Sequence, residues 1–307
     1  MPPLLQSASY IGRFAPSPTG PLHSGSLIAA LASFLDARSA QGKWLIRIED
    51  TDPPREQTGA STEILRALDA HQLHWDDEVV YQSQRSAIYQ AATRSLIEQQ
   101  QAFYCSCSRL QLKHHDIYPG TCRQQSQPTT LPASVRILCQ NSRIVFEDRI
   151  QGRQSQNLSQ DIGDFVIFRK DGLPAYQLAT AIDDAEQGIT HVMRGHDLLD
   201  STPRQIYLQQ RLQMTSPSYA HIPVLAKKDG QKLSKQNLAA PLIYDSPTAC
   251  SNNLLQALKI LQQDPPNDLQ QQCSADILAW AVSHWAPQHI PAIPAIKKDQ
   301  PDFTASI

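Results

Sequence analysis

The feature that most restricts the fold of this chain is a strand, a helix and a second strand within residues 10–48. Residues 10–15, Tyr-Ile-Gly-Arg-Phe-Ala, are rich in aromatic and β-branched types and predict a strand. Apolar residues from Leu27 to Leu35 then recur at helical spacing, and residues 44–48, Trp-Leu-Ile-Arg-Ile, predict a second strand. A unit of this length predicts parallel strands joined by a right-handed crossover, and therefore an α/β fold.

The loop between the first strand and the helix has the properties of an anion site. Backbone N–H groups at the start of the helix face His23, Ser24 and Gly25, and such a helix end attracts phosphate. The Gly-x-Gly-x-x-Gly pattern of dinucleotide folds is absent. Gly20 and Gly25 have the spacing of a Walker A loop, but Ser26 and a leucine follow where that loop needs lysine and a hydroxyl residue. The segment therefore predicts a different nucleotide site.

Residues 13–26, Arg-Phe-Ala-Pro-Ser-Pro-Thr-Gly-Pro-Leu-His-Ser-Gly-Ser, resemble the "HIGH" signature of class I aminoacyl-tRNA synthetases in its glutamyl and glutaminyl form. The resemblance implies that His23, Gly25 and Ser26 bind ATP, with His23 and the helix amides at the phosphates. Gly25 has no side chain, so the adenine can approach the backbone closely. Ser26 stands where the motif has its second histidine, and this departure puts the second phosphate contact in question.

A second segment resembles the "KMSKS" loop of the same class. Residues 221–225, His-Ile-Pro-Val-Leu, predict a strand, Asp229 begins a tight turn, and Lys-Leu-Ser-Lys-Gln follows at residues 232–236. The ammonium groups of Lys232 and Lys235 would neutralise charge on the leaving pyrophosphate. We expect His23 and these two lysines to be catalytic, and Lys235 to bind ATP together with Mg²⁺.

A pocket for glutamate needs cations for two carboxylates and an anion for one ammonium. Residues 165–179 predict a hairpin, and residues 191–205 closely resemble a glutamyl-tRNA synthetase segment. This resemblance implies that Arg194 faces the substrate side-chain carboxylate, that Arg13 supplies a second cation, and that Glu49 receives the α-ammonium; Arg204 is the next candidate cation. Buried guanidinium groups would be left unpaired around glutamine, so glutamate is favoured. The other expected pocket residues are Phe14, Ala15, Pro16, Ser17 and Tyr176.

Three cysteines within eighteen residues predict a metal site. The thiolates of Cys105, Cys107 and Cys122 suit tetrahedral zinc, which needs a fourth ligand. General frequencies favour a histidine, and His114 and the adjacent His115 lie between the cysteines. The family resemblance instead implies the phenol of Tyr118, in a Cys-x-Cys, Tyr, Cys pattern. No open coordination position is implied, so the expected role is structural.

The chain has 307 residues and a formal net charge of −2, so contact with nucleic acid would depend on local basic patches. Six cysteines are too few for a disulfide framework. The N-terminus lacks the basic segment of a signal peptide, and no apolar run approaches the ~18 residues of a membrane span. These features predict a soluble cytoplasmic protein with no membrane partner.

The motifs together predict three regions. A Rossmann-like catalytic domain with a parallel sheet, of the class I synthetase type, is expected at residues 1–100 and 165–240, interrupted by a zinc-bearing insertion at residues 101–164. A short helical C-terminal region is expected at residues 241–307. In it, Ser246 and Pro247 begin a helix that runs to about Gln262, and a second helix covers about residues 268–285.

The short length, the cysteine element and the Lys-Leu-Ser-Lys-Gln loop together resemble the shortened relatives of glutamyl-tRNA synthetase that modify queuosine. That resemblance implies activation of L-glutamate with ATP without tRNA, and transfer to the cyclopentene diol of queuosine in the anticodon of tRNA(Asp), by a monomer. The large helical anticodon domain of full-length glutamyl-tRNA synthetases is not expected. Two other interpretations are a minimal glutamyl-tRNA synthetase charging the acceptor end and a small-molecule nucleotidyltransferase. A catalytically inactive tRNA-binding relative is disfavoured by Lys232, Lys235 and Glu49.

Overall fold

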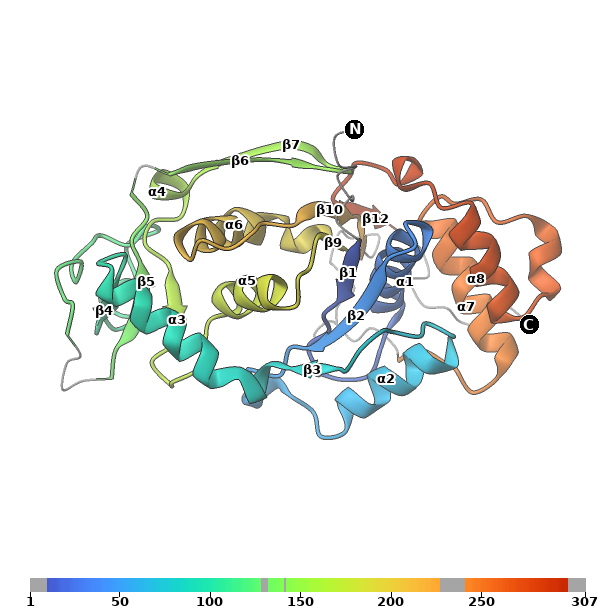
Figure 1. Cartoon of the computed structure of the whole chain (residues 1–307), viewed down its shortest axis with the longest axis horizontal. Helices are drawn as coiled ribbons and strands as arrows, with labels where there is room; N and C mark the ends of the chain where they lie inside the picture. The colour runs from blue at the N-terminus through green and yellow to red at the C-terminus, as the bar shows by residue number, and fades with distance from the viewer. Residues whose placement is uncertain (1–9, 128–131, 141, 227–240, 298–307) are drawn as a thin grey trace, which may run out of the picture.

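A computed structural model describes residues 10–127, 132–140, 142–226 and 241–297 (Figure 1). The molecule is elongated, with parallel strands in the middle, the sheet formed by β4, β5 and β8 at one end and helices α7 and α8 at the other. The helices are α1 (Ser24–Ser39), α2 (Ala60–Ala70), α3 (Ser86–Glu98), α4 (Leu158–Asp161), α5 (Tyr176–Glu186), α6 (Thr202–Arg211), α7 (Pro247–Ile260) and α8 (Ser274–Ser283). The catalytic loop predicted at residues 232–236 lies outside the described residues.

Across the described ranges, the strands form four sheets. β1, β2 and β3 are parallel, β10 is parallel to both β6 and β9, β11 is parallel to β12, and β4, β5 and β8 are antiparallel. The strands are β1 (Ile11–Phe14), β2 (Lys43–Ile48), β3 (Val80–Tyr81), β4 (Ala102–Cys105), β5 (Ser134–Ile137), β6 (Arg143–Asp148), β7 (Gly152–Asn157), β8 (Val166–Phe168), β9 (His191–Gly195), β10 (Ser218–Ile222), β11 (Val224–Ala226) and β12 (Ala295–Lys297).

The predicted strand, helix and strand are confirmed as β1, α1 and β2, with β1 parallel to β2. Hydrogen bonds then connect β1 to the segment that enters β9, because Thr190 donates its N–H to the carbonyl of Ile11 at 2.9 Å and accepts from the N–H of Ile11 on Oγ1 at 2.8 Å. The two groups of parallel strands therefore lie edge to edge, and the α/β fold class is confirmed.

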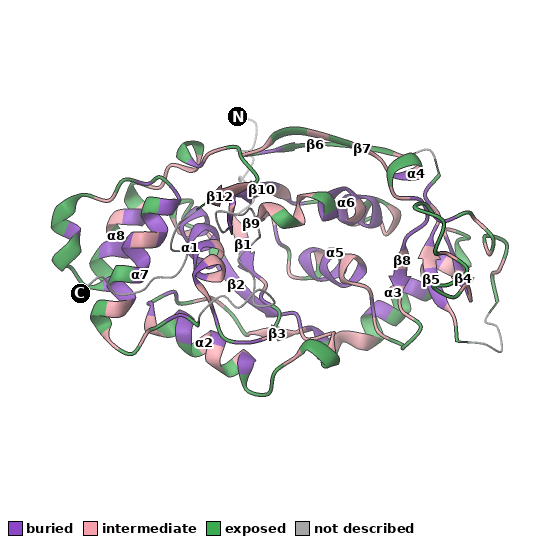
Figure 2. Cartoon of the chain, turned by 180° about the vertical axis from the view of Figure 1, so that it is seen from behind, coloured by how far each residue is buried: buried purple, intermediate pink, exposed green. Residues whose placement is uncertain are grey.

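Two hydrophobic clusters pack against these strands. One joins α1 to α2, α7 and α8 through residues such as Leu31, Ile64 and Leu258, and the other joins α5 and α6 to β9 and β10 through residues such as Ile182 and Tyr219. Figure 2 shows exposed residues on the outer faces of α2, α7 and α8, whereas α1, α5 and α6 are buried or half-buried along most of their length. The parallel strands are covered by helices from both directions, as is usual for parallel sheets.

The hairpin predicted for residues 165–179 is wrong in its second half. β8 is followed by a turn in which Arg169 donates its N–H to the carbonyl of Leu173 at 2.8 Å, but α5 begins directly afterwards at Tyr176. Leu178, Ala179 and Ile182 are spaced for one helical face, and all three are buried. The strand predicted at residues 221–225 is divided at Pro223, which lacks the N–H that a continuous strand needs.

The C-terminal region contains the two predicted helices with altered bounds. Ser246 caps α7, accepting the N–H of Ala249 at 3.2 Å, and proline occupies the first turn as predicted. The second helix is shorter than predicted, because a 3-10 helix at Asn267–Gln271 precedes α8 and breaks the continuous helical segment. Within the described residues, no helix has the length and apolar character needed to cross a bilayer.

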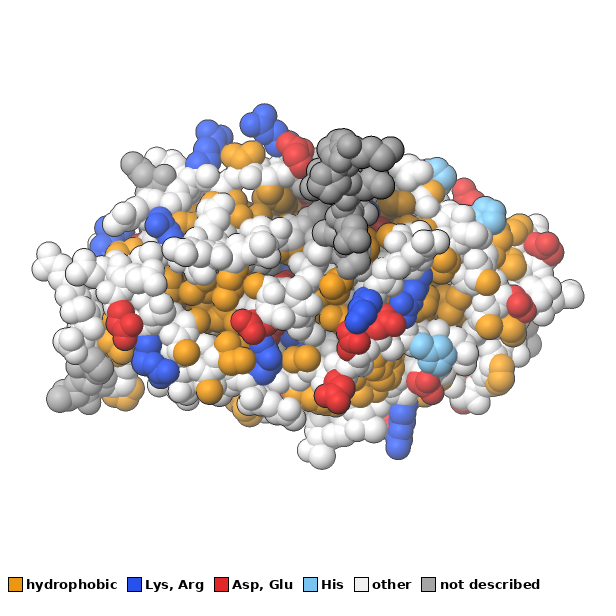
Figure 3. Space-filling view, in the orientation of Figure 1, with side chains coloured by type: hydrophobic (Ala, Val, Ile, Leu, Met, Phe, Trp, Pro, Cys, Tyr) orange, Lys and Arg blue, Asp and Glu red, His pale blue; other side chains and the backbone are white. Residues whose placement is uncertain are grey.

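The boundaries of the insertion, residues 101 and 164, stay a prediction from the sequence. Its β4 and β5 join β8 in the antiparallel sheet, whereas β6 leaves that sheet and pairs with β10 beside the parallel strands. The hairpin of β6 and β7 therefore runs from near α4 to the middle of the molecule (Figure 1). Figure 3 shows Lys and Arg side chains projecting from the upper edge, where this hairpin lies, and its exposed residues include Arg143 and Arg153.

Candidate active site

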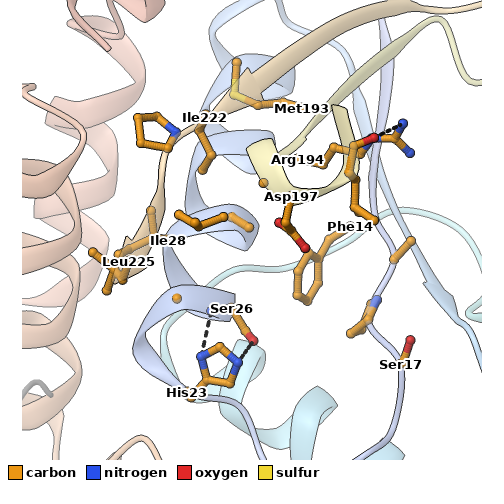
Figure 4. Close-up of a pocket in the computed structure, with 18 of the residues that line it drawn as sticks. Phe14, Ser17, His23, Ser26, Ile28, Met193, Arg194, Asp197, Ile222 and Leu225 are labelled. Carbon is orange, nitrogen blue, oxygen red and sulfur yellow. Dashed lines mark hydrogen bonds between the residues drawn. The ribbon is translucent and has the colours of Figure 1, made fainter. Parts of the chain in front are cut away.

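A cavity of about 400 Å³ opens where β1 ends, α1 begins and β9 and β10 end (Figure 4). The carboxyl ends of parallel strands and a helix N-terminus meet there, which is the usual ligand position in open α/β sheets. The cavity is lined by Arg13, Phe14, Ala15, Pro16, Ser17, Thr19, His23, Gly25, Ser26, Ile28, Ala29, Tyr176, Met193, Arg194, Gly195, Asp197, Leu198, Ile222, Pro223, Val224 and Leu225.

His23 caps the N-terminus of α1 at one side of this cavity. Its Nδ1 accepts the N–H of Ser26 at 3.3 Å, and its Nε2 lies 3.0 Å from Oγ of the same residue (Figure 4). Because Nδ1 accepts, Nε2 carries the proton and donates to the serine hydroxyl. Ser26, which replaces the second histidine of the signature, thus orients the first.

Arg194, at the end of β9, lies on the other side of the cavity and is only 4% exposed. Its Nη2 donates to Oγ1 of Thr202 and to Oε1 of Gln205, both at 2.8 Å, and its Nε donates to Nε2 of His221 at 3.0 Å. These partners are neutral, and within the described residues Nη1 is buried without a hydrogen-bond partner. A buried guanidinium with one unused edge can bind an anion.

Arg13 has a different environment. It forms an ion pair with Asp184 of α5, from Nε to Oδ1 at 3.2 Å, and Nη2 of Arg47 lies 2.8 Å from the same oxygen. Arg47 also approaches Glu49, whose Oε1 is 3.4 Å away. Burial raises the pKa of Glu49 above its ordinary value, although Arg47 and Arg13 act in the opposite direction.

The charges of this buried cluster balance. The three carboxylates Glu49, Asp183 and Asp184 face the three guanidinium groups of Arg13, Arg47 and Arg85, the last lying 2.7 Å from Asp183. Arg194 belongs to none of the ion pairs formed among the described residues. Arg194 therefore lines the cavity without a direct carboxylate contact among the described residues.

Glu49 lies in a second cavity of about 370 Å³ that shares Ser17, Thr19 and Tyr176 with the first. Its other lining residues are mostly polar or charged: Thr51, Asp52, Arg55, Glu56, Gln57, Gln82, Arg169 and Pro174. Tyr176 stands between the two spaces, so a ligand with groups in both would pass beside its ring.

One close approach in the first cavity requires glycine. A Cβ atom added to Gly195 would lie 2.5 Å from Oδ1 of Asp197 and 3.2 Å from Cγ1 of Val224. Gly195 therefore lets the chain turn from β9 into the 3-10 helix His196–Ser201 while Asp197 stays in the cavity. Asp197 was not predicted as a site residue, because an aspartate that follows a histidine in a loop has no distinguishing pattern.

The structure brings together the predicted cysteines. Sγ of Cys107 is 3.6 Å from Sγ of Cys122, the phenol oxygen of Tyr118 is 3.5 Å from Sγ of Cys105, and the three thiols lie within 4.8 Å of one another. Tetrahedral zinc with Zn–S bonds of about 2.3 Å would separate its sulfur ligands by about 3.8 Å. The cluster therefore has the size of a metal site. His114 and His115 are exposed and do not belong to this group within the described chain.

The predicted residues thus separate into three places. Arg13, Phe14, Ala15, Pro16, Ser17, His23, Gly25, Ser26, Tyr176 and Arg194 line the first cavity, Glu49 lines the second, and Lys232 and Lys235 lie outside the described residues. Arg204, the alternative cation, is absent from both linings and donates to the carbonyl of Asp200 at 3.2 Å. Two further residues, His221 and Asp148, stand behind Arg194 and were not predicted as site residues.

Comparison with known proteins agrees with this geometry. Residues 11–259 match the family described as tRNA synthetases class I (E and Q), catalytic domain. The fold is also similar to that of a glutamate tRNA ligase from Elizabethkingia meningosepticum, solved in complex with its amino acid, with a TM-score of 0.79 and 25% identity over 94% of this chain and 67% of that one. The fold and the sequence family are those of a class I aminoacyl-tRNA synthetase.

Relatives with higher sequence identity identify one family within this class. The glutamyl-Q tRNA(Asp) synthetase of Pseudomonas fluorescens is 48% identical over 96% of this chain and 98% of its own length. That of Thiobacillus denitrificans is also 48% identical, over 97% of this chain and all of its own. The chain belongs to the glutamyl-Q tRNA(Asp) synthetases, a family of ATP-dependent ligases.

Proposed function

We propose that this protein activates L-glutamate with ATP in the absence of tRNA, and then transfers the glutamate to queuosine in the anticodon of tRNA(Asp). The observation that carries the proposal is Arg194, a buried guanidinium that lines the cavity and has no carboxylate partner among the described residues. A ligand with a side-chain carboxylate supplies the missing charge. Glutamine would leave the cation unpaired, at a cost of several kcal/mol.

The remaining groups of glutamate and ATP have suitable neighbours. Glu49 lies in the adjoining cavity beside Tyr176, where it can receive the α-ammonium. The N-terminus of α1, with His23 and Gly25, offers N–H groups for phosphate, and Ile28 and Leu225 form an apolar wall for adenine. ATP enters with Mg²⁺. An oxygen of the α-carboxylate of glutamate attacks the α-phosphorus of ATP as pyrophosphate leaves. Lys232 and Lys235 are proposed to neutralise that pyrophosphate.

We also propose that the cysteine cluster binds structural zinc, with Tyr118 as fourth ligand. Its phenol oxygen lies 3.5 Å from Sγ of Cys105 and 3.9 Å from Sγ of Cys107, and it accepts the N–H of Cys122 at 2.8 Å. The ion would hold together a region of loops. We assign the activity to a monomer in the cytoplasm, where thiols remain reduced.

Exchange of labelled pyrophosphate into ATP tests the activation step. Glutamate should support exchange without tRNA, glutamine should not, and Arg194→Gln should weaken glutamate-dependent exchange by about 100-fold or more with little change in the Michaelis constant for ATP. Arg204→Gln is the matched control, because its guanidinium lies outside both cavities. Exchange that requires tRNA would favour an ordinary glutamyl-tRNA synthetase, and exchange indifferent to glutamate would favour a small-molecule nucleotidyltransferase.

A further inference from the structure

Three buried side chains from three adjacent strands form a line that ends at the amino-acid cavity. Arg194 on β9 pairs in register with His221 on β10, and β10 is in turn paired with β6, which ends at Asp148. Nε of Arg194 donates to Nε2 of His221 at 3.0 Å, and Nδ1 of His221 donates to Oδ2 of Asp148 at 2.5 Å. Their exposed fractions are 4%, 0% and 3%.

Three polar neighbours, Arg194, Asp148 and Thr202, determine the protonation of His221; Oγ1 of Thr202 lies 3.2 Å from Nε2 and can donate to it. Nε2 faces the N–H of Arg194, which can only donate, so Nε2 must accept and the proton resides on Nδ1, toward the carboxylate. Burial lowers the pKa of His221 to about 4; the hydrogen bond with Asp148 acts against this shift, whereas the charges of Arg194 and His196 contribute to it. The imidazole is therefore neutral near pH 7.

Asp148 is itself held firmly. Its Oδ1 accepts the N–H groups of Gln151 at 2.8 Å, Ile150 at 3.0 Å and His221 at 3.1 Å, which leaves Oδ2 for the imidazole. The first two donors belong to the turn between β6 and β7. The hairpin therefore fixes the carboxylate, the carboxylate fixes the imidazole, and the imidazole accepts from the guanidinium.

This arrangement leaves one edge of Arg194 for a ligand. His221 accepts from Nε, and Thr202 and Gln205 accept from Nη2, so the plane of the guanidinium is set from behind, and Nη1 has no hydrogen-bond partner among the described residues. We propose that His221, held by Asp148, is a positioning residue that orients Arg194 for the side-chain carboxylate of the amino acid. This inference rests on the proposed function, since it assigns that carboxylate to Arg194.

Two substitutions of similar size separate positioning from simple packing. His221→Asn keeps an amide near Nδ1, able to donate to Asp148, but has no atom that reaches Nε of Arg194. His221→Gln is longer and can place its amide oxygen near the former Nε2. We expect His221→Asn to raise the Michaelis constant for glutamate by about tenfold or more, with little change for ATP, and His221→Gln to restore most of the affinity.

Asp148→Asn provides a second variant that leaves the imidazole in place. The amide oxygen can accept the three backbone N–H groups, so its NH₂ faces Nδ1 and forces the other tautomer, with an N–H directed at Arg194. The Michaelis constant for glutamate should again rise about tenfold or more. Circular dichroism and thermal unfolding identify the variants that fold. If His221→Asn does not fold, the Michaelis constant of folded Asp148→Asn tests the positioning role.

Arg194→Gln distinguishes failure of this inference from failure of the proposed function. If Arg194→Gln leaves the Michaelis constant for glutamate unchanged, the proposed pocket is wrong. If Arg194→Gln raises it while folded His221→Asn and Asp148→Asn do not, only the positioning role is overturned. If the proposed pocket and the positioning role are both correct, adding His221→Asn to Arg194→Gln should raise the Michaelis constant for glutamate little further, because the two residues act as one unit.

Discussion

Arg13, at the end of β1, lies 3.2 Å from Asp184 of α5, measured from Nε to Oδ1, and both side chains are almost completely buried. Arg13 lines the amino-acid cavity, but its charge is already balanced inside the protein. Of these two arginines, Arg194 is therefore the one that can accept an anionic ligand without losing a direct carboxylate partner among the described residues. This relationship assigns different contributions to two arginines that the sequence motifs treat alike.

Asp184 should be among the most important charges for stability. Replacing it with asparagine leaves Arg13 and Arg47 without their closest carboxylate oxygen in a buried region, so we expect the free energy of unfolding to fall by about 3–5 kcal/mol. Urea denaturation followed by circular dichroism measures this change. Asp171→Asn is the control, since it breaks an exposed pair with Arg169 that contributes at most about 1 kcal/mol. Equal small losses in both variants would contradict the assignment.

Lys235→Ala should reduce the turnover number of adenylate formation by about 100-fold or more. The variant lacks the ammonium group that is proposed to neutralise the negative charge of the leaving pyrophosphate. Pyrophosphate exchange at saturating glutamate and ATP measures the effect. Lys259→Ala, an exposed lysine of α7, should leave the rate unchanged. A normal turnover number in the Lys235 variant would remove this residue from the mechanism.

The cysteine cluster predicts one zinc ion per chain, measurable by inductively coupled plasma mass spectrometry of freshly purified protein. Cys105→Ser and Cys122→Ser should each lose most of the metal, because a structural zinc site needs all of its thiolates. Cys273→Ser is a suitable control, since Cys273 is exposed at the start of α8 and lies outside the cluster. Tyr118→Phe should weaken retention of zinc against a chelator. Unaltered metal content in the Cys105 and Cys122 variants would place the ion elsewhere.

The free energy of unfolding should fall as the pH decreases from 6.5 to about 4. In this window unfolded chains protonate His221 at its ordinary pKa of 6.5, whereas in the folded protein burial lowers its pKa to about 4, and Asp148 and Arg194 face the ring. The unfolded state therefore binds the extra proton, which amounts to about 3 kcal/mol once the pH is below both values. The measurement compares urea unfolding at several pH values between 4 and 7 for the unaltered protein and His221→Gln.

His71 and His191 also have lowered pKa values because of burial, so both proteins should lose stability in acid. The contribution of His221 is the difference between the two pH profiles. The profile of His221→Gln should be the shallower one between pH 6.5 and 4. Parallel profiles would show that His221 does not titrate in this window.

Local patterns and the family resemblance were sufficient to predict many of the residues that line the first cavity. The strand, the loop with His23 and the helix are contiguous in sequence, and Arg194 was assigned through the resemblance of its segment to one of glutamyl-tRNA synthetase. Asp148 could not be predicted. It lies 73 residues from His221, its contact depends on β6 pairing with β10, and its neighbours carry no motif.

The error in α5 has a similar origin. The segment after Gly172 follows a strand and a turn, which favours a hairpin, and only its packing against its neighbours selects the helix. The charge balance around Arg13 was equally hidden, because Asp183 and Asp184 look like an ordinary solvated pair in the sequence. Their burial beside Arg47 is a property of the assembled fold.

The position of glutamate on the RNA tests the central claim most directly. Labelled glutamate, ATP and the protein are incubated with tRNA(Asp) that contains or lacks queuosine, each with and without its terminal adenosine. We predict label on both queuosine-containing forms, including the one without the terminal adenosine, and none on RNA that lacks queuosine. Label that requires the terminal adenosine and is indifferent to queuosine would contradict the account and identify a synthetase that charges the acceptor end.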